Sequence, residues 1–216
     1  MIRTVSVLAL AGLALGLGAL ISTAPAGDKK DEKGFVDLFD SKTLKGWKVF
    51  PEKLENSISV DDGAIIVKGK PDGYFYTDKS YKNYVLRYDW RYKRPAGLED
   101  DKKFLGNSGL LVHIQKHNVW PKSLEIQGMN RDHGSFIGIG IKVKDYKFDR
   151  EALEKARNKV GEWNTTEATI KDGEASSKVN GVPIASGKFD LTEGPFGFQS
   201  EGAEIHFKNI RIKVLE

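Results

Sequence analysis

Hydrophobic and polar residues alternate in short runs along most of the chain beyond residue 33, and this period of two is typical of β-strands. The clearest run spans residues 84–92 (YVLRYDWRY), where every second residue is aromatic or leucine and the residues between them are Val, Arg, Asp and Arg. Its length and aromatic content predict a central strand with one face in the core.

Turn sequences separate the shorter runs. Asp61-Asp62-Gly63 and Asn180-Gly181 each lie between two apolar runs, which predicts two β-hairpins. Only residues 149–159 (DREALEKARNK) predict a helix; Asp149 is its N-cap, and its few apolar positions place it on the surface. Further strands are predicted at residues 74–77, 110–115, 123–127, 163–170, 196–199 and 205–214. Together these elements predict an all-β fold, an antiparallel β-sandwich with one short surface helix.

The N-terminal segment has a different pattern. Arg3 precedes an apolar run at residues 5–21, and Ala24-Pro25-Ala26 resembles the A-x-A site at which signal peptidase cuts. We therefore predict a signal peptide at residues 1–26, a charged linker at residues 27–33, and a secreted or periplasmic protein. The alternative is an uncleaved N-terminal anchor, because the apolar run is almost long enough to span a bilayer.

Composition restricts the rest of the chain. The 216 residues include no Cys, which excludes disulfides, thiol catalysis and a lipid anchor on an N-terminal Cys. The residues after the signal suffice for one sandwich domain, which we assign to residues 34–216. The formal net charge of +4 becomes +3 when Arg3 is removed with the signal, and charges of both signs are interspersed along the chain. We therefore expect no nucleic-acid partner, and no membrane contact after cleavage.

The best candidate site lies in residues 107–129, NSGLLVHIQKHNVWPKSLEIQGM. Two alternating runs are joined there by a polar loop, and each run has one apolar and one polar face. His113 lies on the polar face of the first run, and Glu125 and Gln127 lie on that of the second. If the two strands are neighbours in one sheet, these side chains converge on one surface. The structural alternatives are an exposed or hydrogen-bonded His113 and a Glu125 that only pairs with a cross-strand arginine.

Several pieces of the sequence together resemble a known family. In order they are GFVDLF at 34–39 with LKGW at 44–47, LRYDWRY at 86–92 with NSGLLVH at 107–113, EIQ at 125–127, GEWN at 161–164, NGV at 180–182 and GPFGFQSEGAEIHFKNIRIK at 194–213. In this order they resemble the bacterial 3-keto-disaccharide hydrolases, also described as 3-keto-glucoside lyase/hydratase-like domains. The resemblance implies a concanavalin A-like jelly roll whose curved sheet holds a saccharide.

The resemblance also implies a reaction and roles for the candidate residues. Its substrate is a glycoside with a C3 ketone, supplied by an upstream sugar 3-oxidoreductase and cleaved by C2 proton abstraction, β-elimination of the C1 leaving group and hydration. His113 is then the base. Glu125 is an alternative base, the acid, or a ligand that holds a divalent metal ion together with His113. The remaining candidates would contact the saccharide: Arg91, Asn107, Gln127, His133 in a loop, and Trp120 through ring stacking.

Two departures from the family pattern bear on this hypothesis. Relatives often carry Asp two positions after the Glu-x-Gln motif, where this chain has Met129, and a Tyr in the following glycine-rich loop, which here reads Phe136-Ile137-Gly138. Either change can alter the substrate or leave a domain that binds sugar without cleaving it. The competing functions are therefore a non-catalytic carbohydrate-binding module with the same groove and a structural sandwich with no ligand.

The other tryptophans and histidines are assigned structural roles. Trp47, Trp90 and Trp163 lie in patterns that bury aromatic rings, so we predict them in the core. His117 is predicted to be a loop residue and His206 a structural residue of the last strand, while loop packing is the alternative to sugar stacking for Trp120.

Overall fold

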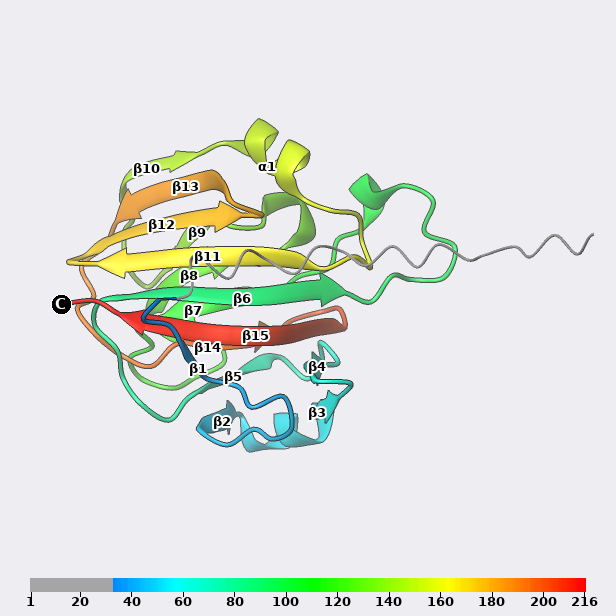
Figure 1. Cartoon of the computed structure of the whole chain (residues 1–216), viewed down its shortest axis with the longest axis horizontal. Coiled ribbons are helices and arrows are strands. Elements are labelled where there is room, and N and C mark those ends of the chain that lie inside the picture. Colours follow the sequence, from blue (N-terminus) through cyan, green and yellow to red (C-terminus); the bar gives the residue numbers. More distant parts are fainter. Residues whose placement is uncertain (1–32) are drawn as a thin grey trace, which may run out of the picture. The chain divides into compact units, whose positions relative to one another are not determined.

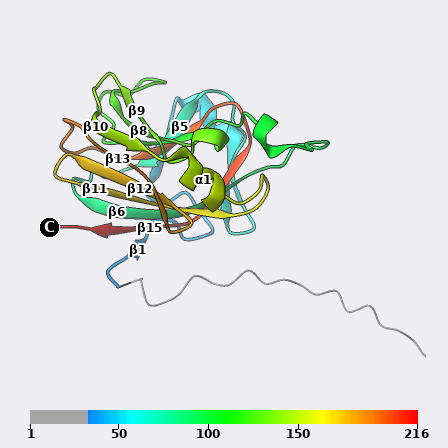
Figure 2. The ribbon, with the colours of Figure 1, turned by 90° about the horizontal axis from the view of Figure 1, so that it is seen from above.

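The predicted central strand is β6 (Tyr84–Tyr92), which lies inside the larger of two antiparallel sheets (Figure 1). The structure is a computed structural model that describes residues 33–216. The signal peptide predicted at residues 1–26 lies outside the described residues, as does the linker predicted at 27–33 except for its last residue. Residues Gly34–Glu216 form one unit, in which the sheets stack as two layers (Figure 2).

The larger sheet has nine strands. Its order is β10 (Lys144–Phe148), β13 (Val182–Lys188), β12 (Glu174–Val179), β11 (Asn164–Lys171), β6, β15 (Ile205–Val214), β4 (Ala64–Val67) and β3 (Ile58–Asp61), with β1 (Val36–Asp37) also paired to β15. The smaller sheet has six strands, in the order β2 (Trp47–Phe50), β5 (Gly73–Thr77), β14 (Gly197–Ser200), β7 (Gly109–Val112), β8 (Ser123–Gln127) and β9 (Phe136–Ile139).

Short helical segments connect some of these strands. They are the 3-10 turns η2 (Glu52–Ser57), η3 (Asp101–Lys103) and η4 (Asn130–Asp132), and the helix α1 (Arg150–Ala156). The predicted N-cap of α1 is confirmed, because the Asp149 side chain accepts a hydrogen bond from the Ala152 N–H. The helix ends at Ala156 rather than at residue 159, and its Leu153 is buried. No helix within residues 33–216 is long and apolar enough to cross a membrane.

Both predicted hairpins are present. Asp61 pairs with Ala64 across Asp62-Gly63, whose φ angles are 46° and 69°. Val179 pairs with Val182 across Asn180-Gly181, whose φ angles are 49° and 83°. Positive φ at both central residues is the geometry that favours Asp-Gly and Asn-Gly in two-residue turns.

The core lies between the two sheets, and its aromatic rings come from both of them. The β6 residue Tyr88 packs edge-on against Phe198 of β14 at 4.8 Å between ring centroids. Trp47 and Trp90 are buried there as predicted. The prediction for Trp163 was wrong: this half-buried residue precedes β11, so strand alternation does not turn it inward. The predicted all-β antiparallel sandwich is confirmed.

Candidate functional site

The polar cluster of this domain lies on the outer face of the six-stranded sheet. Leu124 and Ile126 of β8 are part of the core between the sheets, so Glu125 points away from it. Glu125 is paired with Leu111 in β7, and Gln127 is paired with Gly109. The prediction that these two strands are neighbours in one sheet is therefore correct, and Glu125 and Gln127 share one face.

A second carboxyl group approaches Glu125 on this face. Glu201 follows β14 directly and forms an isolated bridge with Asn107, just before β7. The side chain of Glu125 is only 5% exposed, and burial raises the pKa of its carboxyl to about 8, with a further contribution from the charge of Glu201. Burial also raises the pKa of Glu201, against a hydrogen bond from Asn107 that lowers it. At neutral pH Glu125 is therefore mainly protonated and can donate a proton.

Two amide oxygens beside these carboxyls have no hydrogen-bond partner within residues 33–216. They are Oε1 of Gln199, in β14, and Oδ1 of Asn107. A Cβ added at Gly109 would clash with Gln199 Oε1 and would lie 2.7 Å from Glu125 Oε1, so both side chains occupy the space that this glycine leaves open. Buried acceptors without a donor are costly, so these two oxygens call for a hydrogen-bond donor.

Aromatic side chains cover the other half of the same face. His117 packs against Tyr76 at 4.5 Å between ring centroids, with the rings tilted by 40°, and its Nδ1 lies 2.8 Å from the Tyr74 hydroxyl oxygen. Phe50 of β2 stacks on Tyr74 at 5.6 Å. Tyr76 is three strands away from Glu125 through Gly197 and Leu111, which is about 14 Å at the usual strand spacing. The face thus combines a carboxyl half and an aromatic half on strands of the same sheet.

The predicted convergence of His113 with Glu125 was wrong. β7 ends at Val112, and His113 has a φ of 53°, a left-handed conformation that breaks the alternation of the strand. Its ring lies between the sheets beside Phe189 and Tyr84, where Nδ1 is 3.2 Å from Leu191 O and Nε2 is 3.0 Å from Lys82 O.

This placement changes the chemistry available to His113. Burial lowers the pKa of His113, and both ring nitrogens face carbonyl oxygens rather than a ligand. The predicted metal pair of His113 and Glu125 therefore does not form. Across residues 33–216 no group of three or more His, Cys, Asp or Glu residues could hold a metal ion.

Two further predicted residues lie in the other layer or in the core. Arg91 of β6 points to the outer face of the nine-stranded sheet, where its guanidinium lies 4.5 Å from the centre of the Trp163 ring. His133 is buried, not on a loop rim: it stacks on Trp90 at 3.8 Å, its Nε2 is 2.9 Å from Thr166 Oγ1, and burial lowers its pKa to about 3. Neither can contact a ligand on the carboxyl face.

The other predicted contacts are distributed as follows. Asn107 lies at the carboxyl half, as described above. The Oε1 atom of Gln127 accepts a hydrogen bond of 2.7 Å from the Met129 N–H, so this side chain fixes the chain that leaves β8. Trp120 is 51% exposed in the loop between β7 and β8, and no ring contact that involves it is seen among the described residues.

Sequence reasoning missed Gln199, Glu201 and the aromatic half. The run Gly197-Phe198-Gln199-Ser200-Glu201 alternates, which was a usable signal that Gln199 and Glu201 share the face opposite Phe198. Alternation could also have grouped Tyr74 with Tyr76. His117 gave no such signal, because a loop has no period from which to infer the direction of its side chains.

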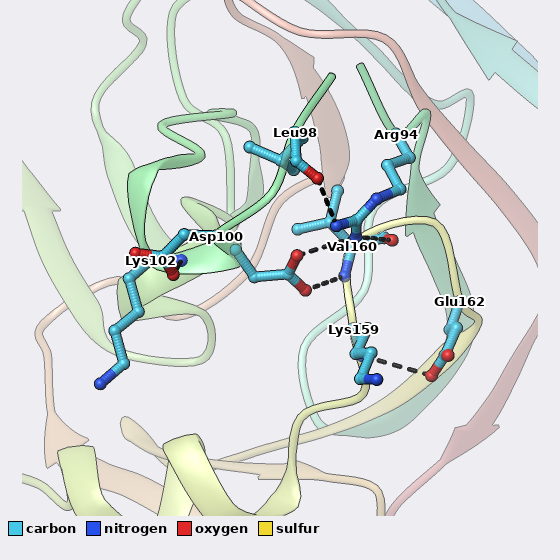
Figure 3. A network of polar contacts seen from close by, with 8 residues as sticks. Arg94, Leu98, Asp100, Lys102, Lys159, Val160 and Glu162 are labelled. Carbon is cyan, nitrogen blue, oxygen red and sulfur yellow. Dashed lines mark hydrogen bonds and ion pairs between the residues drawn. The ribbon is translucent and has the colours of Figure 1, made fainter. Parts of the chain in front are cut away.

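The loop that enters β7 is tied to a neighbouring loop (Figure 3). Arg94 donates hydrogen bonds to Leu98 O at 2.7 Å and to Val160 O at 2.9 Å, and it pairs with Asp101 at 2.8 Å. The second Asp101 oxygen accepts a bond of 2.7 Å from the Val160 N–H. These contacts hold the segment that leads to Asn107.

Comparison with known proteins decides the family. A model of the 3-keto-alpha-glucoside-1,2-lyase-like domain matches residues 34–213. The chain belongs to this family. Membership confirms the resemblance seen in the sequence, and it supports a role in cleaving glycosides.

Relatives of this lyase-like domain agree with the assignment. A 3-keto-disaccharide hydrolase of Bacteroides thetaiotaomicron is 21% identical over 246 residues, covering 86% of this chain and 80% of the relative. A crystal structure from Parabacteroides distasonis, provisionally named a glycosyl hydrolase, superposes with a TM-score of 0.61 at 24% identity and covers 85% of this chain and 94% of that one. The carbohydrate-binding module CBM66 of Bacillus subtilis superposes with a TM-score of 0.52 at 13% identity, covering 78% and 95%. These structural likenesses show the jelly-roll fold.

Proposed function

We propose that this protein cleaves 3-keto-glycosides by elimination and hydration, and that Glu125 and Glu201 transfer the protons. The observation that carries the proposal is the buried Glu125 carboxyl, with a pKa raised to about 8, beside a second carboxyl on the outer face of the six-stranded sheet. Two carboxyls in environments of different burial take different proton-transfer roles. The proposal places the reaction at this pair and gives His113 no chemical role.

The ketone at C3 makes the C2 proton acidic. Glu201, the less buried carboxyl, removes that proton as a carboxylate, the C1–C2 double bond forms, and the bond from C1 to the leaving oxygen breaks. Glu125 gives its proton to the departing oxygen. In the second half, water adds to C1, Glu125 takes a proton from the water, and C2 regains a proton from Glu201, so each carboxyl returns to its starting state.

The remaining groups on the face fit substrate binding. The unpartnered oxygens of Gln199 and Asn107 would accept hydrogen bonds from hydroxyls of the keto sugar. The aromatic rings around His117 would pack against the second ring of a disaccharide. We propose in addition that the protein is exported, on the signal-like residues 1–26, and that a sugar 3-oxidoreductase forms its substrate.

The test is incubation with 3-keto-trehalose and 3-keto-glucosides, with and without EDTA, followed by product analysis. We expect turnover by wild type and a loss of at least about a hundredfold in kcat for Glu125→Gln and for Glu201→Gln, because each removes a proton-transfer step. Glu52→Gln, at an exposed position on η2, is the matched control for the loss of one carboxyl. Unchanged turnover by Glu125→Gln would overturn the assigned role.

The aromatic half by itself favours a second candidate, a carbohydrate-binding module that does not cleave its ligand. Under this alternative wild type binds the saccharide in calorimetry and turns over no 3-keto substrate. The Tyr76→Ala variant would then lose affinity, whereas Glu125→Gln would keep it. Turnover of the 3-keto substrates and the saccharide affinity of these two variants therefore distinguish the enzyme from the binding module.

A further inference from the structure

Positive charge is concentrated on the outer face of the nine-stranded sheet. On the adjoining strands β6, β11, β12, β13 and β15, and on β10 where it lines the hollow described below, nine cationic and four acidic side chains lie on this face. The cations are Arg87, Arg91, Lys147, Lys171, Lys178, Lys188, Lys208, Arg211 and Lys213, and the acids are Asp89, Asp145, Glu167 and Glu174. These thirteen side chains carry a formal charge of +5, and Asp37 and Asp61 of the outlying strands β1 and β3 offset part of it. Charges that are mixed along the sequence are segregated by the fold.

A row of hydroxyl groups crosses this face perpendicular to the strands. Ser186 pairs with Ser176, and Ser176 pairs with Thr169 on the next strand. Lys147 of the edge strand β10 pairs with Ser186 at the end of the row. The hydroxyl row thus runs over three neighbouring strands, β13, β12 and β11, and Lys147 of β10 lies beside its end.

The surface is hollowed along this row. One hollow of about 460 Å³ is lined by all three hydroxyl residues and by Lys147, Lys171 and Lys188. A second hollow of about 680 Å³ shares Lys147, Ser176 and Ser186 with the first. The two hollows therefore adjoin, with the serines and a lysine between them.

The cations of the first hollow differ in how far they are already neutralised. Lys188 lies 3.5 Å from both Asp145 and Glu174 and is paired with them. Glu167, another acid of this face, is paired with Arg87 at 2.6 Å and not with a lysine of the first hollow. Lys147 and Lys171 form no ion pair with any residue in the range 33–216. Two lysines are thus available to an anionic ligand that sits on the hydroxyl row.

We infer that this face binds an acidic polysaccharide, with its carboxylate or sulfate groups on Lys147 and Lys171 and its hydroxyls on the serine and threonine row. The lysines that line the first hollow outnumber its two acids, Asp145 and Glu174, which favours an anionic ligand, and closely spaced side-chain hydroxyls suit a ligand that carries hydroxyls itself. Of the described residues that line the hollows, only Phe148 is aromatic, and the Arg150 guanidinium covers it at 5.3 Å. A nucleic acid would lack a platform for base stacking there.

This binding site is independent of the proposed reaction, because it lies on the opposite layer from Glu125. Retention of an acidic polysaccharide on this face would hold the domain at a polymer while the outer face of the six-stranded sheet stays accessible. The ligand class follows from the charges and hydroxyls alone, so the inference survives a failure of the proposed function.

The test uses the full chain in affinity electrophoresis and calorimetry with polygalacturonate and heparin, and with dextran as the neutral polymer. We expect binding to one or both acidic polymers, a loss of affinity with rising salt, and no retardation by dextran. The double variant K147Q/K171Q should bind about tenfold more weakly, since two charge contacts are lost. The control K42Q/K53Q removes the same charge from exposed lysines elsewhere and should bind as wild type does.

Contrary outcomes are equally specific. Absence of binding to both acidic polymers, or equal weakening by the two double variants, overturns the site. Binding of duplex DNA or of phosphatidylglycerol vesicles that exceeds polysaccharide binding and depends on Lys147 and Lys171 overturns the ligand class. Turnover of 3-keto substrates by K147Q/K171Q should equal that of wild type, so failure of the catalytic proposal is read separately.

Discussion

The buried carboxyl of Glu125 makes the stability of this domain depend on pH in an unusual direction. Its pKa is raised from the ordinary value of 4.5 to about 8 in the folded protein. Between these two values the folded state holds a proton that the unfolded state has released. Because the folded state binds more protons there, the free energy of unfolding falls as pH rises. Most carboxyls that form ion pairs make stability rise with pH, so a fall in stability with pH identifies a carboxyl that burial keeps protonated.

The magnitude follows from the size of the shift. Each pH unit between 4.5 and 8 lowers the free energy of unfolding by about 1.4 kcal/mol. The total decrease is therefore roughly 3 kcal/mol at pH 7 and roughly 5 kcal/mol above pH 8. Glu125 is 5% exposed, which leaves little water to screen the effect. Glu125→Gln removes the titrating group while keeping the shape of the side chain, so its stability relative to wild type should rise steadily from pH 4.5 to pH 8.

The assay is urea unfolding followed by tryptophan fluorescence at half-unit steps from pH 4.5 to pH 8.5. The quantity to compare is the difference in unfolding free energy between Glu125→Gln and wild type, which should grow by about 1.4 kcal/mol per unit. Glu52→Gln serves again as the control for the loss of one carboxyl. A difference that stays constant over the window would show that the carboxyl is not held protonated by burial, and the acid role of Glu125 would fall with it.

Three other perturbations give distinct outcomes. Gly109→Ala inserts a methyl group into the space occupied by the carboxyl and amide above it, so we expect a stability loss of about 1–3 kcal/mol in urea unfolding and a marked loss of turnover; turnover equal to wild type would contradict the packing described. His113→Ala removes a buried ring that, as a neutral imidazole, donates one hydrogen bond to either Leu191 O or Lys82 O, and it should cost about 1–3 kcal/mol in the same assay, whereas kcat per folded molecule should stay near wild type. Loss of kcat without loss of stability would restore His113 as the base. Arg94→Ala removes the bonds that tie two loops together, and hydrogen exchange should show faster exchange of the Val160 amide; unchanged protection would mean that the pair with Asp101 is dispensable.

Most of the fold could be predicted from the sequence because the dominant signals were local. The alternation of residues 84–92 matches the bounds of β6, and the Asp-Gly and Asn-Gly turns determined two hairpins. The order of the strands in the sheets could not be predicted, since β14 lies between β5 and β7 although long stretches of chain separate all three. Such pairings depend on which surfaces pack together, and a single sequence does not record that.

The candidate site was half predictable for the same reason. Glu125 and Gln127 face the side that alternation assigned to them, because β8 extends over both. His113 was misplaced because β7 ends one residue earlier and a left-handed φ turns its ring into the core. A strand pattern does not show where the strand stops, and a polar residue at its end can reach backbone carbonyls instead of solvent. His133 shows the same effect, as a histidine in a polar loop that becomes a buried stacking partner of Trp90.

The position of β15 constrains when the domain can form. This strand is the last in the described chain, yet it lies between β6 and β4 and also carries the pairing of β1. A chain emerging from a ribosome or a translocation channel therefore cannot join the two parts of its larger sheet until residues 205–214 arrive. Up to that moment β4 and β1 lack their β15 neighbour, and we expect the domain to fold late and in one step rather than by growth from its N-terminus.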